Sequence, residues 1–268
     1  MFSIFDFGAN WEEFSKRRID RQRLEMACES LQFLLEKKSL AGKSFLDVGC
    51  GSGLFSIAAH QLGARKVVGI DVNPRCIETS QANRDLLAPG STIEFHVASA
   101  LEPEQLKRFG KFDFVYAWGS LHHTGAMWNA VHNVSGCVAP EGILVMAIYN
   151  KHVTSPVWKS IKWIYNQVPG LVQGFMILMF AGIIYVAKLL VTGTNPLIKE
   201  RGMDFWFDVI DWVGGYPYQY ATYREVESFV TNQGFEMRRY ISATVPTGCN
   251  QFVFDRKSAT TNQNNFQS

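Results

Sequence analysis

The sequence lacks any marked excess of charge. Its 268 residues contain 26 Lys and Arg against 24 Asp and Glu, a formal net charge of +2. Domains that bind nucleic acid usually carry a strong basic excess, so we expect no nucleic acid partner. The basic residues that do cluster, Lys16, Arg17, Arg18, Arg21 and Arg23, have the spacing of a solvated helix face.

The sequence also lacks paired cysteines. Its five cysteines are scattered at Cys28, Cys50, Cys76, Cys137 and Cys249, and none forms a C-x-x-C pair. This excludes a disulfide framework and a zinc site of the usual spacing, so we expect no metal and a reducing compartment. The first residues, MFSIFDFGANW, lack a basic segment followed by an apolar one. We therefore expect no signal peptide and a cytoplasmic location.

Strands and helices alternate through the first half of the chain. After one or two amphipathic helices between residues 12 and 38, short apolar runs alternate with helical patterns up to residue 150. Two further strands are predicted near the end, after residue 221. This order predicts an α/β fold, a doubly wound, mostly parallel seven-stranded sheet with an N-terminal helical cap and a helical insertion between strands five and six. The strands are predicted at 43–49, 66–73, 93–99, 112–118, 142–150, 236–245 and 249–257.

A glycine-rich turn follows the first predicted strand, in FLDVGCGSGLFSIAA. It does not match the dinucleotide fingerprint G-x-G-x-x-G, because Leu54 or Ser56 stands at the third position. Asp47 lies just before the glycines, where a carboxylate would repel a pyrophosphate but would favour a cationic sulfonium cofactor. Asp71, which closes the second strand, is spaced to accept hydrogen bonds from ribose hydroxyls in either class of cofactor.

FLDVGCGSG, VVGIDVN and FDFVYAWGSLHHTG resemble signature motifs of the class I S-adenosylmethionine-dependent methyltransferases, which have a Rossmann-like fold. The resemblance covers residues 43–150 and resumes at 221–254, and FGANW and AIYN are similar to an uncharacterised bacterial subgroup related to small-molecule and sugar O-methyltransferases. It implies a methyltransferase that uses S-adenosylmethionine, although many members carry an acid where Ser99 stands. The cofactor residues it implies are Asp47, Gly49, Cys50, Gly51, Gly53, Asp71, Val72, Ser99, Ala100 and Trp118.

Two adjacent histidines, His122 and His123, follow the fourth predicted strand, at the edge where open α/β sheets bind their ligands. An oxygen nucleophile is helped by a base near pH 7, and histidine suits that role. In similar O-methyltransferases the first histidine of such a pair often acts as the base, which implies His122 as base and His123 as the residue that orients either His122 or the substrate. The alternative is that both are structural.

The fourth strand lacks the Asn/Asp-Pro-Pro-Tyr motif that is typical of enzymes methylating amide or exocyclic nitrogens. We therefore expect transfer to a hydroxyl of a small-molecule, sugar-type or lipid-linked acceptor, while carbon, sulfur and amine nitrogen remain open. The alternatives are a membrane-surface methyltransferase of a lipid or quinone and a non-catalytic cofactor-binding scaffold protein. The candidate acceptor contacts are Tyr149, Asn150, Trp206, Asp208, Trp212 and Tyr216.

Residues 171–187 contain no charge, and extended to Val191 the stretch is long enough to span a bilayer. A single span would put strands five and six, which share a sheet, on opposite sides of a membrane. Three alternatives remain for 171–191: a lid, a contact between two copies in a homodimer, or a helix at a membrane surface, which would make the protein peripheral.

These observations divide the chain into five segments. Phe7, Asn10 and Trp11 in the first segment are candidates to close over the cofactor. The segments are a helical cap at 1–42, a cofactor-binding core at 43–150, an apolar and aromatic lid at 151–220, the completion of the core sheet at 221–257, and a disordered tail at 258–268.

Overall fold

A computed structural model describes residues 5–193, 195–197 and 204–258. All but the first residue of the tail expected at 258–268 therefore lies outside the described residues.

The core is a seven-stranded sheet with the order β3-β2-β1-β4-β5-β7-β6. Every neighbouring pair is parallel except the two that involve β7, which runs antiparallel to β5 and β6. This confirms the predicted sheet. The strands are β1 Ser44–Val48, β2 Lys66–Asp71, β3 Glu94–Val97, β4 Phe112–Trp118, β5 Val138–Tyr149, β6 Phe235–Ile241 and β7 Cys249–Arg256.

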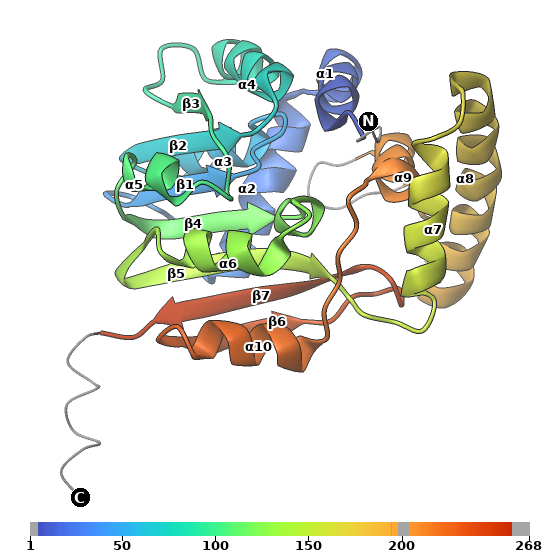
Figure 1. Cartoon of the computed structure of the whole chain (residues 1–268). Helices are drawn as coiled ribbons and strands as arrows, with labels where there is room; N and C mark the ends of the chain where they lie inside the picture. Colours follow the sequence, from blue (N-terminus) through green and yellow to red (C-terminus); the bar gives the residue numbers. More distant parts are fainter. Residues whose placement is uncertain (1–4, 194, 198–203, 259–268) are drawn as a thin grey trace, which may run out of the picture.

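Helices cover both faces of the sheet (Figure 1). Neighbouring β1 residues point to opposite faces, so Phe45 joins one buried apolar cluster and Leu46 the other. The cluster around Phe45 includes side chains of α2 and α3, and the one around Leu46 includes side chains of α6 and α10. The helices of the core and its cap are α1 Phe7–Arg18, α2 Arg21–Leu35, α3 Leu54–Gln61, α4 Pro74–Leu87, α5 Pro103–Lys107, α6 Met127–Ser135 and α10 Tyr223–Thr231.

Three helices form the insertion between β5 and β6: α7 Ser155–Tyr165, α8 Gly170–Thr192 and α9 Phe205–Gly214. They stand beyond the carboxyl ends of β4 and β5, with α8 at the outer edge of the molecule (Figure 1). Their buried residues make a third apolar cluster, separate from the two on the sheet. This cluster consists of Tyr165, Ile177, Ala181, Ile184, Phe205, Val209 and Val213.

Helix α8 is apolar on all sides but buried on only one. Within the described residues it is the single helix long and apolar enough to cross a membrane, judged by length and composition. Ile177, Ala181 and Ile184 pack into the cluster with α9, whereas Leu171 and Leu190 are 90% and 79% exposed. The insertion therefore packs α8 along one side and leaves the opposite side uncovered.

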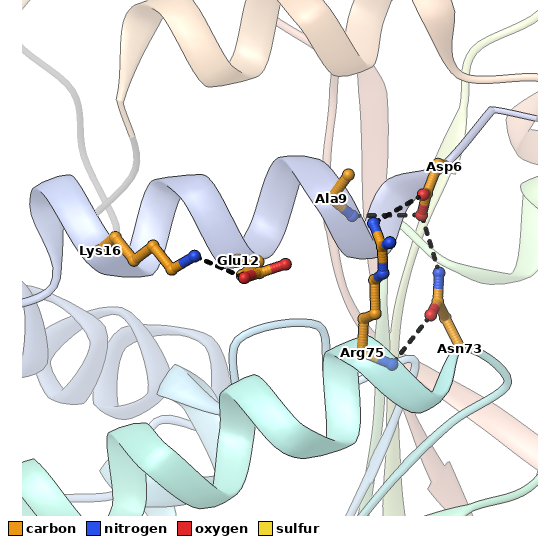
Figure 2. A network of polar contacts seen from close by, with 6 residues as sticks. All are labelled: Asp6, Ala9, Glu12, Lys16, Asn73 and Arg75. Atoms are coloured by element: carbon orange, nitrogen blue, oxygen red, sulfur yellow. Dashed lines mark hydrogen bonds and ion pairs between the residues drawn. The ribbon is translucent and has the colours of Figure 1, made fainter.

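Helix α1 is fixed against the start of α4 by one carboxylate (Figure 2). Asp6 caps α1 by accepting a hydrogen bond from the Ala9 backbone at 3.1 Å. Its two oxygens also accept from Asn73 Nδ2 at 3.1 Å and from Arg75 Nη1 at 3.3 Å. Because Asn73 follows Asp71 at the end of β2, Asp6 holds the N-terminal helix over this edge of the sheet.

We predict that Asp6→Ala lowers the free energy of unfolding by about 1 kcal/mol, because α1 loses its N-cap and its contacts with α4. Glu12→Ala is the control, since it removes an exposed pair with Lys16 and should change stability much less than Asp6→Ala does. Urea unfolding monitored by circular dichroism measures both. Equal stabilities for the two variants would contradict the role given to Asp6.

Candidate active site

A cavity of about 840 Å³ lies at the carboxyl ends of β1, β2 and β4, a volume typical of a site for small molecules. Phe7 and Trp11 of α1 also line it, as do Asp208 and Trp212 of α9. Of the residues expected to bind the cofactor, all but Gly51 and Gly53 line this cavity, as do both histidines.

Asp47, at the end of β1, is almost completely buried beside the cavity. Its Oδ2 accepts a hydrogen bond from Ser56 Oγ at 2.7 Å. Removal from water raises the pKa of this carboxyl to about 7, and the hydrogen bond from Ser56 only partly opposes the rise. A cation in the cavity would stabilise the ionised form, so the position fits a positively charged ligand.

Asp71, at the end of β2, has a fixed orientation. Its Oδ2 accepts from the Gly51 backbone at 3.1 Å, and its Oδ1 accepts from the Asn73 backbone at 2.9 Å. Burial raises the pKa of the carboxyl, and these two hydrogen bonds oppose the shift. Asp71 lines the cavity, so its carboxylate is placed to accept hydrogen bonds from hydroxyls bound there.

The glycines of the turn leave space for side chains from other parts of the chain. Gly49 and Gly51 have positive φ angles of 74° and 56°, a conformation that favours glycine. A Cβ atom on Gly49 would lie 2.3 Å from Ser120 Cβ, and one on Gly51 would lie 2.9 Å from the Trp11 ring. The bare backbone thus admits Ser120 and Trp11 to the site, and these two line the cavity themselves.

Ser99 and Trp118 complete the group around the turn. Ser99 donates its backbone N–H to Gln105 Oε1 at 3.0 Å, and its hydroxyl accepts from the Leu101 backbone at 3.1 Å. The hydroxyl therefore still has a proton to donate where many similar enzymes carry an acid. Trp118 donates its indole N–H to Gln251 of β7 at 3.3 Å, which fixes its ring beside the cavity.

The two histidines stand on a short 3-10 turn, Leu121–His123, directly after β4. His123 Nδ1 lies 2.7 Å from the Pro217 carbonyl oxygen. A carbonyl can only accept, so Nδ1 carries the proton and Nε2 keeps its lone pair. His122 is 1% exposed and its ring packs against those of His123 and Tyr149, with centroid distances of 4.4 and 4.1 Å. Its Nδ1 has no hydrogen-bond partner among the described residues.

Both imidazoles are neutral at physiological pH. Burial lowers the pKa of His123 to about 3 and that of His122 well below its ordinary value, and the positive charge of Lys162 lowers both further. The lone pair of His123 Nε2 is therefore available over the whole physiological range.

Lys162 of α7 is completely buried, and the sequence analysis did not single it out. Its Nζ donates to the Trp212 carbonyl oxygen and lies over the rings of Tyr149 and Tyr218, 5.3 and 4.9 Å from their centroids. Burial lowers its pKa to about 7. The pattern SPVWKSIKWIY gives no signal for this position, because a lysine in an amphipathic helix is normally placed on the outer face.

Asp211 of α9 faces the cavity and contacts the N-terminal helix. Asn10 Nδ2 donates to Asp211 Oδ1 at 2.7 Å and to the Phe207 carbonyl oxygen at 3.3 Å. Burial raises the pKa of Asp211 to about 8, and nearby Asp208 adds to the rise. Asn10, a candidate to close over the cofactor, therefore joins α1 to α9 beside the cavity.

The candidate acceptor residues divide into two groups. Tyr149, Asp208 and Trp212 line the cavity. Asn150 instead donates to the Pro246 carbonyl oxygen at 2.9 Å, and Trp206 is 44% exposed on the outside of α9. Asn150, Trp206 and Tyr216 are not among the lining residues.

Other lining residues had no signal in the sequence. Ile184 and Lys188 line the cavity from α8, Val245 from the β6–β7 connection and Cys249 from the start of β7.

Comparison with known proteins identifies a family for most of the chain. A family model described as a methyltransferase domain matches residues 19–238, which is most of the chain. Among curated proteins, the ribosomal protein L11 methyltransferase of Tolumonas auensis is 34% identical over 116 residues, which make up 42% of this chain. The match covers only 36% of that enzyme, so the chain aligns with about a third of the length of this relative.

Two solved structures share the fold over most of their length. Magnesium protoporphyrin IX methyltransferase from Synechocystis PCC 6803, with bound S-adenosylhomocysteine, has a TM-score of 0.55 at 17% identity, covering 87% of this chain and 83% of that one. The N-methyltransferase NodS from Bradyrhizobium japonicum WM9, also with bound S-adenosylhomocysteine, has a TM-score of 0.51 at 15% identity, covering 88% and 86%.

The cavity lies at the same motifs that resemble the cofactor site of these enzymes, and its buried carboxylates suit a cationic ligand. The chain belongs to the family described as a methyltransferase domain, whose model matches residues 19–238.

Proposed function

We propose that this protein is an enzyme that transfers the methyl group of S-adenosylmethionine to a hydroxyl of a small-molecule, sugar-type or lipid-linked acceptor. The observation that carries the proposal is the imidazole of His123, whose Pro217 contact leaves Nε2 as a proton acceptor in a cavity shared with Asp47 and Asp71. An oxygen acceptor needs such a group, because its proton must leave when the oxygen attacks carbon.

Asp47 and Asp71 hold the two polar ends of the cofactor in this scheme. When bound, S-adenosylmethionine supplies an electrophilic methyl group on a sulfonium. Asp47, with Ser56 fixing one oxygen, offers negative charge to the cationic part, and Asp71 accepts from the ribose hydroxyls. Phe7 and Trp11 of α1 cover this part of the cavity and exclude water, which strengthens both contacts.

His123 accepts the proton of the acceptor hydroxyl at Nε2. Its lowered pKa means that the proton moves only after the new O–C bond has begun to form, when the oxygen has become strongly acidic. His122 packs beneath it, against Tyr149, and holds the ring of His123 in place. The expectation that His122 itself is the base stays a prediction, and matched variants of the two residues separate the roles.

Cofactor binding tests the role of Asp71. Asp71→Asn keeps the size of the side chain but replaces one acceptor oxygen with an NH2 group, which faces the backbone donors of Gly51 or Asn73. We expect the affinity for S-adenosylhomocysteine, measured by calorimetry, to fall about tenfold to a hundredfold. Asp85→Asn, on the exposed side of α4, should leave it unchanged. Unchanged affinity in Asp71→Asn would contradict the ribose contact.

The pH dependence of stability tests Asp47. In the folded protein without cofactor its pKa is about 7, against an ordinary value of 3.8, so the folded state binds more protons between these values. The free energy of unfolding therefore falls as the pH rises through this window. Asp47→Asn removes this titration, so Tm should decrease less between about pH 5 and about pH 8 in the variant than in the wild type. Asp211 adds a fall of stability with pH in both proteins, and the lowered pKa values of His122, His123 and Lys162 add a rise in both, so the difference between the two Tm profiles measures Asp47. Parallel Tm profiles would contradict the raised pKa.

Turnover tests the base. With any hydroxyl compound that the wild type methylates in a panel of phenols, sugars and prenyl alcohols, His123→Gln should lower kcat by about 10²–10⁴-fold. Its affinity for S-adenosylhomocysteine should not change. If His122→Gln lowers kcat more than His123→Gln does, the base is His122 and not His123. If the wild type binds the cofactor and methylates no member of the panel, a different acceptor atom or a scaffold role replaces the proposal.

A further inference from the structure

The outer side of the insertion is a continuous apolar surface. Along α8, Leu171, Phe175, Leu178, Ile183, Val186 and Leu190 are each more than half exposed. Their spacing places them on one side of the helix from Leu171 to Leu190, a distance of about 28 Å at 1.5 Å per residue. We call this stripe, together with exposed Val157 and Ile164 of neighbouring α7, the outer α7–α8 face. Exposed apolar surfaces of this extent are typical of interaction sites.

The charged residues in the sequence segment that contains α7 and α8 are all basic. Between Asn150 and Glu200 the sequence contains no Asp or Glu but has five lysines. Lys159 is exposed on α7, while Lys162 is buried and Lys151 pairs with Glu225 at 3.3 Å. The face can therefore approach a negatively charged surface without bringing any carboxylate of its own segment near it.

The chemistry of the face suits hydrocarbon better than another protein. Protein interfaces usually have a polar rim and about one hydrogen bond per 100–200 Å². Residues 171–187 offer only Gln173 and Tyr185 as polar side chains, both partly covered, and Gln173 already donates to the Tyr165 carbonyl oxygen. A lipid surface requires no hydrogen bonds from the protein, so it is the partner that this composition fits.

The packing of α8 determines its orientation to that surface. A helix at a membrane surface normally turns a polar side to water. In this protein the side of α8 that would otherwise face water packs on α9 instead, because Ile177, Ala181 and Ile184 share an apolar cluster with Val209 and Val213. A bilayer-spanning α8 would lose these contacts, whereas a helix lying in the plane of the surface keeps them and buries its outer stripe in lipid.

We propose that the outer α7–α8 face docks on the surface of an anionic lipid bilayer, with α8 in the plane of that surface. Ile184 and Lys188 of the same helix line the active-site cavity, so docking brings one wall of the cavity to the lipid. The docking is independent of the acceptor atom and of the base, and it is tested without turnover.

The experiment is sedimentation with vesicles of phosphatidylcholine alone and of phosphatidylcholine with phosphatidylglycerol. The wild type should pellet with the anionic vesicles and less with the neutral ones. Phe175→Glu/Leu178→Glu should reduce the pelleted fraction at least about tenfold, because it introduces carboxylates into the stripe. Leu86→Glu, at an equally exposed leucine of α4, should pellet as the wild type does. Calorimetry with S-adenosylhomocysteine shows that each variant is folded.

Three outcomes would overturn the proposal. The first is a wild type that stays in the supernatant with both kinds of vesicle. The second is pelleting that resists alkaline carbonate, which indicates a spanning helix. The third is a wild-type dimer in light scattering that the double glutamate variant converts to a monomer without any vesicle binding, which would identify the face as a contact between two copies.

Discussion

Removal of ionisable groups from water is the constraint on which the site depends. At the carboxyl edge of the sheet, burial raises the pKa of Asp47 to about 7 and of Asp211 to about 8, and lowers the pKa of His123 to about 3 and of Lys162 to about 7. The buried surroundings of the cavity thus favour the neutral forms of these side chains. A cationic cofactor reverses this preference for a nearby carboxyl, because each charge then compensates the other in a medium where water cannot screen them.

The same constraint explains how the insertion is held at the carboxyl edge of the sheet. Helix α9 ends inside the protein, where its last carbonyl groups would lack partners. Lys162 donates to the Trp212 carbonyl and Asn166 to the Gly214 carbonyl at 2.7 Å, so α7 satisfies the end of α9, where a cation is also favoured by the helix dipole. Asn10 of α1 also binds α9, by donating to the Phe207 carbonyl oxygen and to Asp211. Polar contacts therefore connect three distant segments around one cavity.

The sequence predicted the sheet well, because buried parallel strands and amphipathic helices leave clear periodic patterns. It also brought out Asp47 and Asp71, since the ends of neighbouring strands meet at one edge. Lys162 and Ile184 could not be found in this way, because periodicity cannot tell which turn of an inserted helix faces a ligand. The reason for Gly49 was also hidden, since the close neighbour is Ser120, some seventy residues away.

In the proposed docking the outer and inner sides of the insertion would meet different environments, which would account for a helix without a polar side. Each large apolar side chain left in water forgoes about 1.5–3 kcal/mol relative to burial, and α8 exposes several along one stripe. On the inner side, Ile184 and Lys188 face a cavity whose charged groups work only when water is excluded. In the proposed docking, lipid removes the outer stripe from water while α9 keeps the inner side in place, so one helix separates a membrane from a dry polar site.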